Sequence, residues 1–311
     1  MINEPLVEEG IANTTSSRNS NRGLQYMRLL VKDPAAIIGL VIVFVFLGWA
    51  VVQGFLELLY GQSGPAVALL PHNPFTYNLQ INLHPPDHSY IFGTNTYGED
   101  ILSRMLYAMP RDAFISVLVV LSGVLIGGLI GVISGYRGKL TDDIAMRVTD
   151  AFLSLPALIL VIAISVLLGE TLTGLILALV VVWWPIYARF FRAETLKIKN
   201  LDYVQASKLN KVSFFRLFFK YLFINSIDPV IAYAALDFGN VILTYSTLAF
   251  LGIGLEPPIP ELGSMASSGV GTLPTGWWYA IFPGLAILII VIGFVLVGDR
   301  MQDIISNRIN Y

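Results

Sequence analysis

The sequence predicts an all-α polytopic membrane protein with six transmembrane helices and both termini in the cytoplasm. Of its 311 residues, 55% are hydrophobic and only 13% are charged, whereas about a quarter of the residues of a soluble domain are charged. The apolar residues gather into runs close to the length of about 20 residues that a membrane span needs. The six runs are residues 35–52, 113–136, 152–168, 172–188, 230–252 and 277–298.

The distribution of positive charge predicts the orientation of these spans. With the N-terminus inside, all but two of the 19 lysines and arginines lie on the cytoplasmic side, and the exceptions are Arg104 and Arg111. Cytoplasmic loops are enriched in lysine and arginine, so this bias places both termini in the cytoplasm. It also supports an even number of spans, because an odd number would scramble the pattern.

The segments outside the spans divide the chain further. Residues 1–33 form a cytoplasmic tail, polar and disordered at first and then an amphipathic helix over residues 23–32. Asp33 followed by Pro34 has the pattern of an N-cap with proline at the first helical position. Residues 53–112 are external and rich in proline, and their end, residues 99–109, has the spacing of an interfacial helix.

The remaining part, residues 113–300, is predicted to be a five-helix core, followed by a cytoplasmic tail over 301–311. Residues 255–275 contain prolines and glycines but no lysine or arginine, which favours a re-entrant external loop. The cytoplasmic loop over residues 189–228 is by contrast strongly basic. Its basic residues are Arg189, Arg192, Lys197, Lys199, Lys208, Lys211, Arg216 and Lys220. We interpret this loop as a docking site for a soluble protein; the alternative is a merely solvated basic loop.

Polar residues lie within the fifth span, namely Asp237, Asn240, Thr244 and Tyr245. A charge in hydrocarbon costs at least about 2.5 kcal/mol, so Asp237 should not face lipid. The residues are therefore predicted to line a translocation path. The alternative is a structural hydrogen bond from Asp237 to a neighbouring helix.

Four glycines recur at every fourth residue of the second span: Gly123, Gly127, Gly131 and Gly135. Such a column lies on one helix face and lets another helix approach closely, which indicates a packing surface. A second interpretation is a seam that slides during transport.

Several kinds of chemistry are not expected. The absence of cysteine excludes disulfides and thiolate sites. His72, His84 and His88 are the only histidines, and the prolines between His84 and His88 keep those two off a common helix face, so no metal site is predicted. No phosphate-binding loop or paired catalytic residues appear, which argues against hydrolysis of ATP by this chain alone and against an intramembrane enzyme. An ion-gradient-driven transporter remains the competing class, although inverted repeats are not evident.

Three stretches carry a family resemblance. Residues 92–104 are similar to an FGTDxxGRDxxSR segment with Asn95 and Glu99 as substitutions, residues 146–156 to MRxxD…P, and residues 250–265 to FLGxGxxPPxPxxGxM. From Asp33 to Arg300 the chain resembles the C-type permease subunits of ABC importers for oligopeptides, dipeptides and nickel. The resemblance implies the type I permease fold of binding-protein-dependent ABC importers.

The basic loop is similar to the EAA loop of this family, which forms a short coupling helix docked on the ATPase. Only Ala206 of the EAA residues is retained, Lys211 stands at the glycine position and Ile224 at the proline position. Because asparagine tolerates the left-handed conformation, we expect the turn to shift by one residue to Asn210. The expected coupling residues are Tyr203, Val204, Gln205, Ala206, Ser207, Lys208, Asn210 and Lys211.

The resemblance also implies the partners and the mode of action. The chain would form a heterodimer with a homologous permease in the cell membrane, above two ATP-binding subunits and beneath a solute-binding protein. It would bind no cofactor, metal or nucleic acid itself, since ATP and magnesium belong to the ATPase subunits. Peptides are the expected substrate, with oligosaccharides or nickel as alternatives, and Tyr245 stands where family members often have glutamate. Transport would proceed by alternating access.

Overall fold

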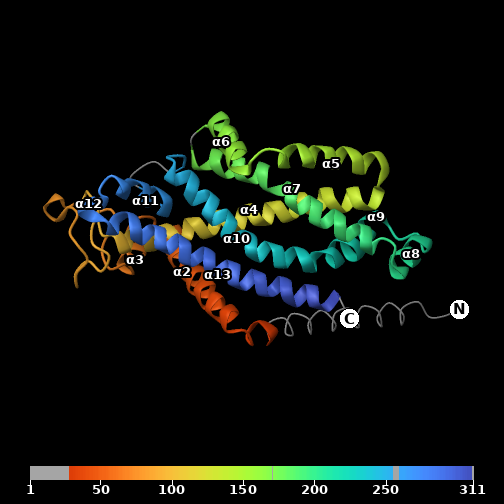
Figure 1. Ribbon diagram of the computed structural model, residues 1–311, viewed down its shortest axis with the longest axis horizontal. Helices are drawn as coiled ribbons and strands as arrows, with labels where there is room; N and C mark the ends of the chain where they lie inside the picture. The colour runs from red at the N-terminus through yellow and green to blue at the C-terminus, as the bar shows by residue number, and fades with distance from the viewer. Residues whose placement is uncertain (1–27, 170, 255–258, 310–311) are drawn as a thin grey trace.

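The computed structural model describes residues 28–169, 171–254 and 259–309. Within these ranges the chain is built from helices and loops, with one isolated bridge between Thr94 and Asp100 (Figure 1). The predicted disordered tail, the first half of the predicted amphipathic helix at 23–32, and Glu256, Pro257 and Pro258 lie outside the described residues.

Five helices of the described part are long and apolar enough to cross a membrane. They contain α2 (Pro34–Tyr60), α4 (Ile101–Arg137), α7 (Leu172–Ile198), α10 (Ile227–Phe250) and α13 (Trp278–Ile309). At the start of α2, the Asp33 side chain accepts hydrogen bonds from the backbone N–H groups of Ala35 and Ala36. The predicted N-cap and proline start of the first span are thus confirmed.

The third predicted span is not a continuous helix. The predicted span at 152–168 contains only the last two residues of α5 (Lys139–Leu153), a break and then α6 (Ala157–Leu168), and the two helices meet at an angle of 90°. The break follows from Pro156, because proline disfavours a helical conformation of the preceding residue and has no N–H to donate. The 12 residues of α6 extend only about 18 Å, so six spans are reached only if the bent pair counts as one.

The second predicted span is longer than expected. Helix α4 has 37 residues and includes all but the first two residues of the segment at 99–109 predicted as a separate interfacial helix. It continues through Pro110, which cannot donate a hydrogen bond to the carbonyl of Leu106. The indole N–H of Trp49 on α2 bonds that carbonyl instead, at 2.8 Å. A side chain from a neighbouring helix therefore satisfies the group that the proline leaves unpaired.

Short elements connect the long helices. At one end of the molecule lie α3 (Pro65–Ala68), α11 (Leu262–Val270) and α12 (Leu273–Gly276), the last two occupying much of the predicted re-entrant loop. At the opposite end, α8 (Asp202–Leu209) is followed by α9 (Phe214–Arg216), the π-helix η2 (Leu217–Phe223) and the 3-10 turn η3 (Ile224–Ser226). The turn η1 (Leu79–Ile81) lies in the segment before α4.

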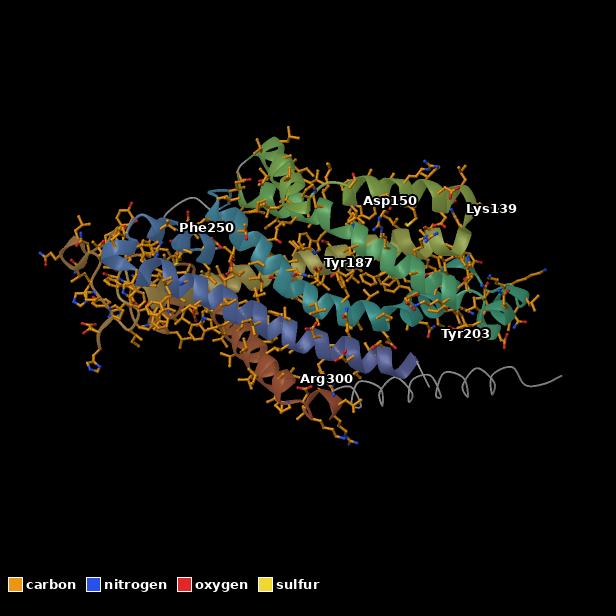
Figure 2. The ribbon with its side chains drawn as sticks, in the orientation of Figure 1. Lys139, Asp150, Tyr187, Tyr203, Phe250 and Arg300 are labelled. Atoms are coloured by element: carbon orange, nitrogen blue, oxygen red, sulfur yellow. The ribbon has the colours of Figure 1, made fainter. Side chains whose placement is uncertain are left out.

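Helix α5 is fastened to α7 by two ion pairs. The guanidinium group of Arg192 makes two hydrogen bonds to the carboxylate of Asp142, each 2.7 Å long. Arg189 donates to Asp150 at 2.6 Å, and Figure 2 shows Asp150 on the helix that runs beside α7. Two-pronged arginine–carboxylate pairs fix geometry, so α5 has a defined orientation on α7 despite the bend that follows it.

Candidate functional site

The residues predicted for coupling form α8 and the turn after it. Val204 and Ser207 are buried, whereas Tyr203, Gln205, Ala206, Lys208, Asn210 and Lys211 are exposed. Figure 2 shows Tyr203 at the end of the molecule opposite Phe250. One face of the short helix is thus anchored on the bundle, and the other is free to contact a partner.

The turn that ends α8 has a defined geometry. The Val212 N–H bonds the carbonyl of Ser207 at 3.2 Å, and the Lys211 N–H bonds that of Lys208 at 3.0 Å. This is the hydrogen-bond pattern of a Schellman motif, which needs a left-handed residue directly after the C-cap. That residue is Lys211, with φ 51°, whereas the C-cap Asn210 has φ −78°. The expected shift of the turn to Asn210 is wrong, because the two bonds close only around Lys211.

Gln205 connects α8 to the helix before it. Its side-chain amide donates a hydrogen bond of 3.0 Å to the carbonyl of Lys199, the C-cap of α7. The ammonium group of Lys199 in turn donates to the carbonyl of Gly135 on α4, at 2.9 Å. A glutamate at position 205 would be unable to donate this bond. The glutamine therefore connects α8 to the end of α7, in addition to lacking the charge that a glutamate would carry.

Two exposed apolar residues near α8 were missed by reasoning from charge. Leu209 is 83% exposed and Phe215 is 74% exposed. Contiguous apolar patches on a surface mark sites of contact with proteins or membranes, whereas single exposed apolar residues are common. In the sequence, this leucine and this phenylalanine stand among the lysines and arginines of the loop, and that pattern could have identified them.

The four residues predicted for the translocation path differ in their exposure. Asp237 is only 2% exposed, and its Oδ2 accepts hydrogen bonds from the indole of Trp183 at 2.6 Å and the hydroxyl of Tyr187 at 2.7 Å. Tyr245 is buried as well, whereas Asn240 is exposed and Thr244 is half-exposed. The carboxylate therefore links α10 to α7 in this conformation, and Tyr187 lies midway along the molecule in Figure 2. A role of these four residues in the path stays a prediction.

The glycine column of α4 faces α7. A Cβ on Gly127 would lie 2.5 Å from the carbonyl oxygen of Trp184, and one on Gly131 would lie 2.3 Å from that of Ala188. Gly123 and Gly135 approach Tyr187 and Thr195 in the same way. Side chains at these positions would force the two helices apart, so the column sets how closely α4 and α7 pack.

A polar cavity of about 460 Å³ lies between the segment before α4 and α11. Its wall includes a buried ion pair in which Arg104 donates to Glu99 at 2.5 Å, and Asn95 donates to the other oxygen of Glu99 at 2.6 Å. Burial raises the pKa of Glu99, and the charge of Arg104 opposes that rise. Tyr77, Tyr97 and Tyr279 add hydroxyl groups and aromatic surface to the cavity.

Two histidines of this segment, His72 and His84, lie against the ring of Tyr90. His72 stacks on Tyr90 with ring centroids 4.6 Å apart, and His84 contacts the same ring at 6.0 Å. Among the residues that the structure describes, histidine, aspartate and glutamate do not gather in groups of three or more that would hold a metal ion. The two histidines instead pack around Tyr90.

Comparison with known proteins identifies the family. Residues 127–311 match the family described as "Binding-protein-dependent transport system inner membrane component". The chain is 37% identical over 240 residues to the probable D,D-dipeptide transport system permease protein DdpC of Escherichia coli, covering 77% of this chain and 80% of that protein. It is 36% identical over 247 residues to the dipeptide transport system permease protein DppC of Haemophilus influenzae, covering 78% and 84%.

The match extends further along a third relative. The chain is 33% identical over 283 residues to the dipeptide transport system permease protein DppC of Bacillus subtilis, covering 91% of this chain and 84% of that protein. The resemblance found in the motifs is thereby confirmed, and the several apolar helices agree with a place in the membrane. The chain belongs to the family of inner membrane components of binding-protein-dependent transport systems.

Proposed function

We propose that this chain is the transmembrane permease subunit of an ATP-driven ABC importer of peptides. The observation that carries the proposal is the form of α8, a short helix with one anchored face and one exposed face at the end of the bundle. The exposed face presents Tyr203, Ala206 and Leu209 to a partner. An ATPase subunit that docks there would move α8 when ATP draws two such subunits together.

Motion of α8 has a direct route into the bundle. The bond from Gln205 to Lys199 ties α8 to the end of α7. Helix α7 in turn packs against the glycines of α4 and bonds Asp237 of α10. A displacement of α8 would therefore move α7 together with α4 and α10 as a body, which is the kind of rigid rearrangement that alternating access requires.

The expected partners follow from the family. A second, homologous permease would complete the translocation path, two ATP-binding subunits would supply ATP and magnesium chemistry, and a solute-binding protein would deliver substrate. Three of the relatives are named as dipeptide or D,D-dipeptide permeases, which favours peptides over oligosaccharides or nickel. The path would run at the interface between the two permeases, with Asn240 and Thr244 on the accessible side of α10.

A single substitution tests the docking surface. Leu209→Asp introduces a charge at a side chain that is 83% exposed, so the fold should be spared while an apolar contact is lost. We expect ATPase subunits to copurify with the wild-type complex and to be lost, or to hydrolyse ATP without peptide uptake, in the variant.

The matched control is Leu79→Asp, which changes a leucine that is 70% exposed in the segment before α4. It should copurify and transport as wild type. If Leu209→Asp transports as well as the control, α8 is not the docking element. Uptake driven by an ion gradient in the absence of ATPase subunits would instead favour the competing class.

A further inference from the structure

Two deeply buried acids belong neither to the predicted coupling residues nor to the predicted path residues. Asp112 on α4 and Glu261 just before α11 are each only 1% exposed. Both carboxylate oxygens of Asp112 and Oε1 of Glu261 are buried without a hydrogen-bond partner among the described residues. Glu261 Oε2 accepts from the Ser264 N–H at 2.7 Å. Since an unpaired buried charge is strongly destabilising, these oxygens require either a counter-charge or a proton.

The two acids lie in the same part of the bundle. Their chain neighbours Ala113 and Leu262 belong to one packed apolar cluster, together with Ile242 of α10. Gly263 lies so close to α10 that a Cβ there would be 1.9 Å from the carbonyl oxygen of Ser246. The carboxyl groups of Asp112 and Glu261 also interact electrostatically with each other. Helix α4, helix α10 and the start of α11 therefore meet at this point.

Two further oxygens of α10 belong to this region. The hydroxyl groups of Tyr245 and Ser246 are buried without a hydrogen-bond partner among the described residues, and the two side chains are 1% and 2% exposed. Tyr245 interacts electrostatically with both Asp112 and Glu261. The unpartnered set thus comprises three carboxylate oxygens, a phenol and a serine hydroxyl. Oxygen-only sets of this kind suit hard cations such as sodium, calcium or magnesium.

The charge balance of the ionised acids favours a single positive charge. Arg111 interacts with both acids and offsets one of their two negative charges. Glu57 on α2 also interacts with Arg111, so at least one negative charge in the region is uncompensated when the acids are ionised. We propose that Asp112, Tyr245, Ser246 and Glu261 bind a sodium ion that joins α4, α10 and the start of α11. Such an ion would lie at the end of the bundle opposite α8 (Figure 1).

Thermal unfolding of the purified complex tests this site without relying on transport. The wild-type complex would be heated in detergent with sodium chloride or with N-methyl-D-glucamine chloride at equal ionic strength. A ligand that binds only the folded state raises the unfolding midpoint, so we expect the midpoint to rise with sodium in a saturable manner. Titration of pH in the sodium-free buffer would show whether a proton replaces the ion.

The variants remove ligands with little change of shape. Asp112→Asn and Glu261→Gln should abolish the sodium-dependent rise, whereas Glu99→Gln, a buried acid paired with Arg104, should keep it. Tyr245→Phe removes one hydroxyl and should raise the sodium concentration for half the effect several-fold, even if the acid variants fail to fold. An equal rise in wild type, Asp112→Asn and Tyr245→Phe would overturn the proposal. So would a wild-type midpoint that responds to pH but not to sodium, which would assign a proton to the two acids.

Discussion

At the scale of single residues, Lys211 adopts the left-handed backbone conformation that a glycine usually adopts. The family pattern has glycine at this position, and the left-handed turn is kept here by lysine. For a residue with a Cβ this conformation costs about 1–2 kcal/mol. The two hydrogen bonds that close the turn hold it in place, so α8 ends here in a Schellman motif although the left-handed residue is not glycine.

Lys211→Gly should therefore stabilise the protein. Removal of the Cβ relieves the left-handed strain, and we expect the free energy of unfolding to rise by about 0.5–1 kcal/mol. Thermal unfolding of the complex measures this change. Lys208→Gly, within α8, is the matched control and should lower stability by about 1 kcal/mol. A fall in stability with Lys211→Gly would show that the lysine side chain contributes more than its backbone strain costs.

At the scale of elements, the sequence predicts where membrane helices lie but not where a helix bends or continues at a proline. Long apolar runs identify α2, α7 and α13 because hydropathy depends on composition alone. The bend at Pro156 and the continuation of α4 through Pro110 depend on what surrounds each proline. Trp49, on a different helix, allows α4 to continue, and no local pattern shows that contact.

Trp49→Phe should expose the dependence of α4 on α2. Phenylalanine keeps most of the apolar contact but cannot donate, so the buried carbonyl of Leu106 would lose the bond that replaces the one missing at Pro110. Leaving a buried acceptor unsatisfied costs about 1–3 kcal/mol. We expect a matching loss in the free energy of unfolding. The double variant Trp49→Phe with Pro110→Ala supplies the control, since alanine restores the donor within α4 and should recover much of that loss.

At the scale of the whole molecule, α4 and α7 pack closely together. They should therefore move as one rigid body when α8 is displaced. The candidate coupling residues could be predicted from their position and basicity. Asp112 and Glu261 could not, because one stands next to a span and the other in a loop, where hydropathy does not reveal burial. Tyr245 and Ser246, which we propose share an ion with them, come from α10, more than a hundred residues from Asp112 in the chain.

Gly131→Ala should disturb this body. The added methyl would lie 2.3 Å from the carbonyl oxygen of Ala188, so the helices must separate, and overpacking of this kind costs about 1–3 kcal/mol. We expect lower thermal stability and less peptide uptake per ATP hydrolysed by the complex. Gly284→Ala on α13, where nothing lies within 4 Å of the new methyl, should leave both unchanged or slightly raise stability. Equal behaviour of the two variants would mean that the α4–α7 seam tolerates separation.

Tryptophan fluorescence can report on three junctions between segments of this protein. Of the five tryptophans in the chain, Trp49 donates to Leu106, Trp183 to Asp237 and Trp278 to Thr94. Each indole bridges two segments that are distant in the chain, so its emission wavelength and quenching depend on whether that junction is closed. Single-tryptophan versions of the protein would therefore report the α2–α4, α7–α10 and α13–loop junctions separately, in real time and without an attached dye.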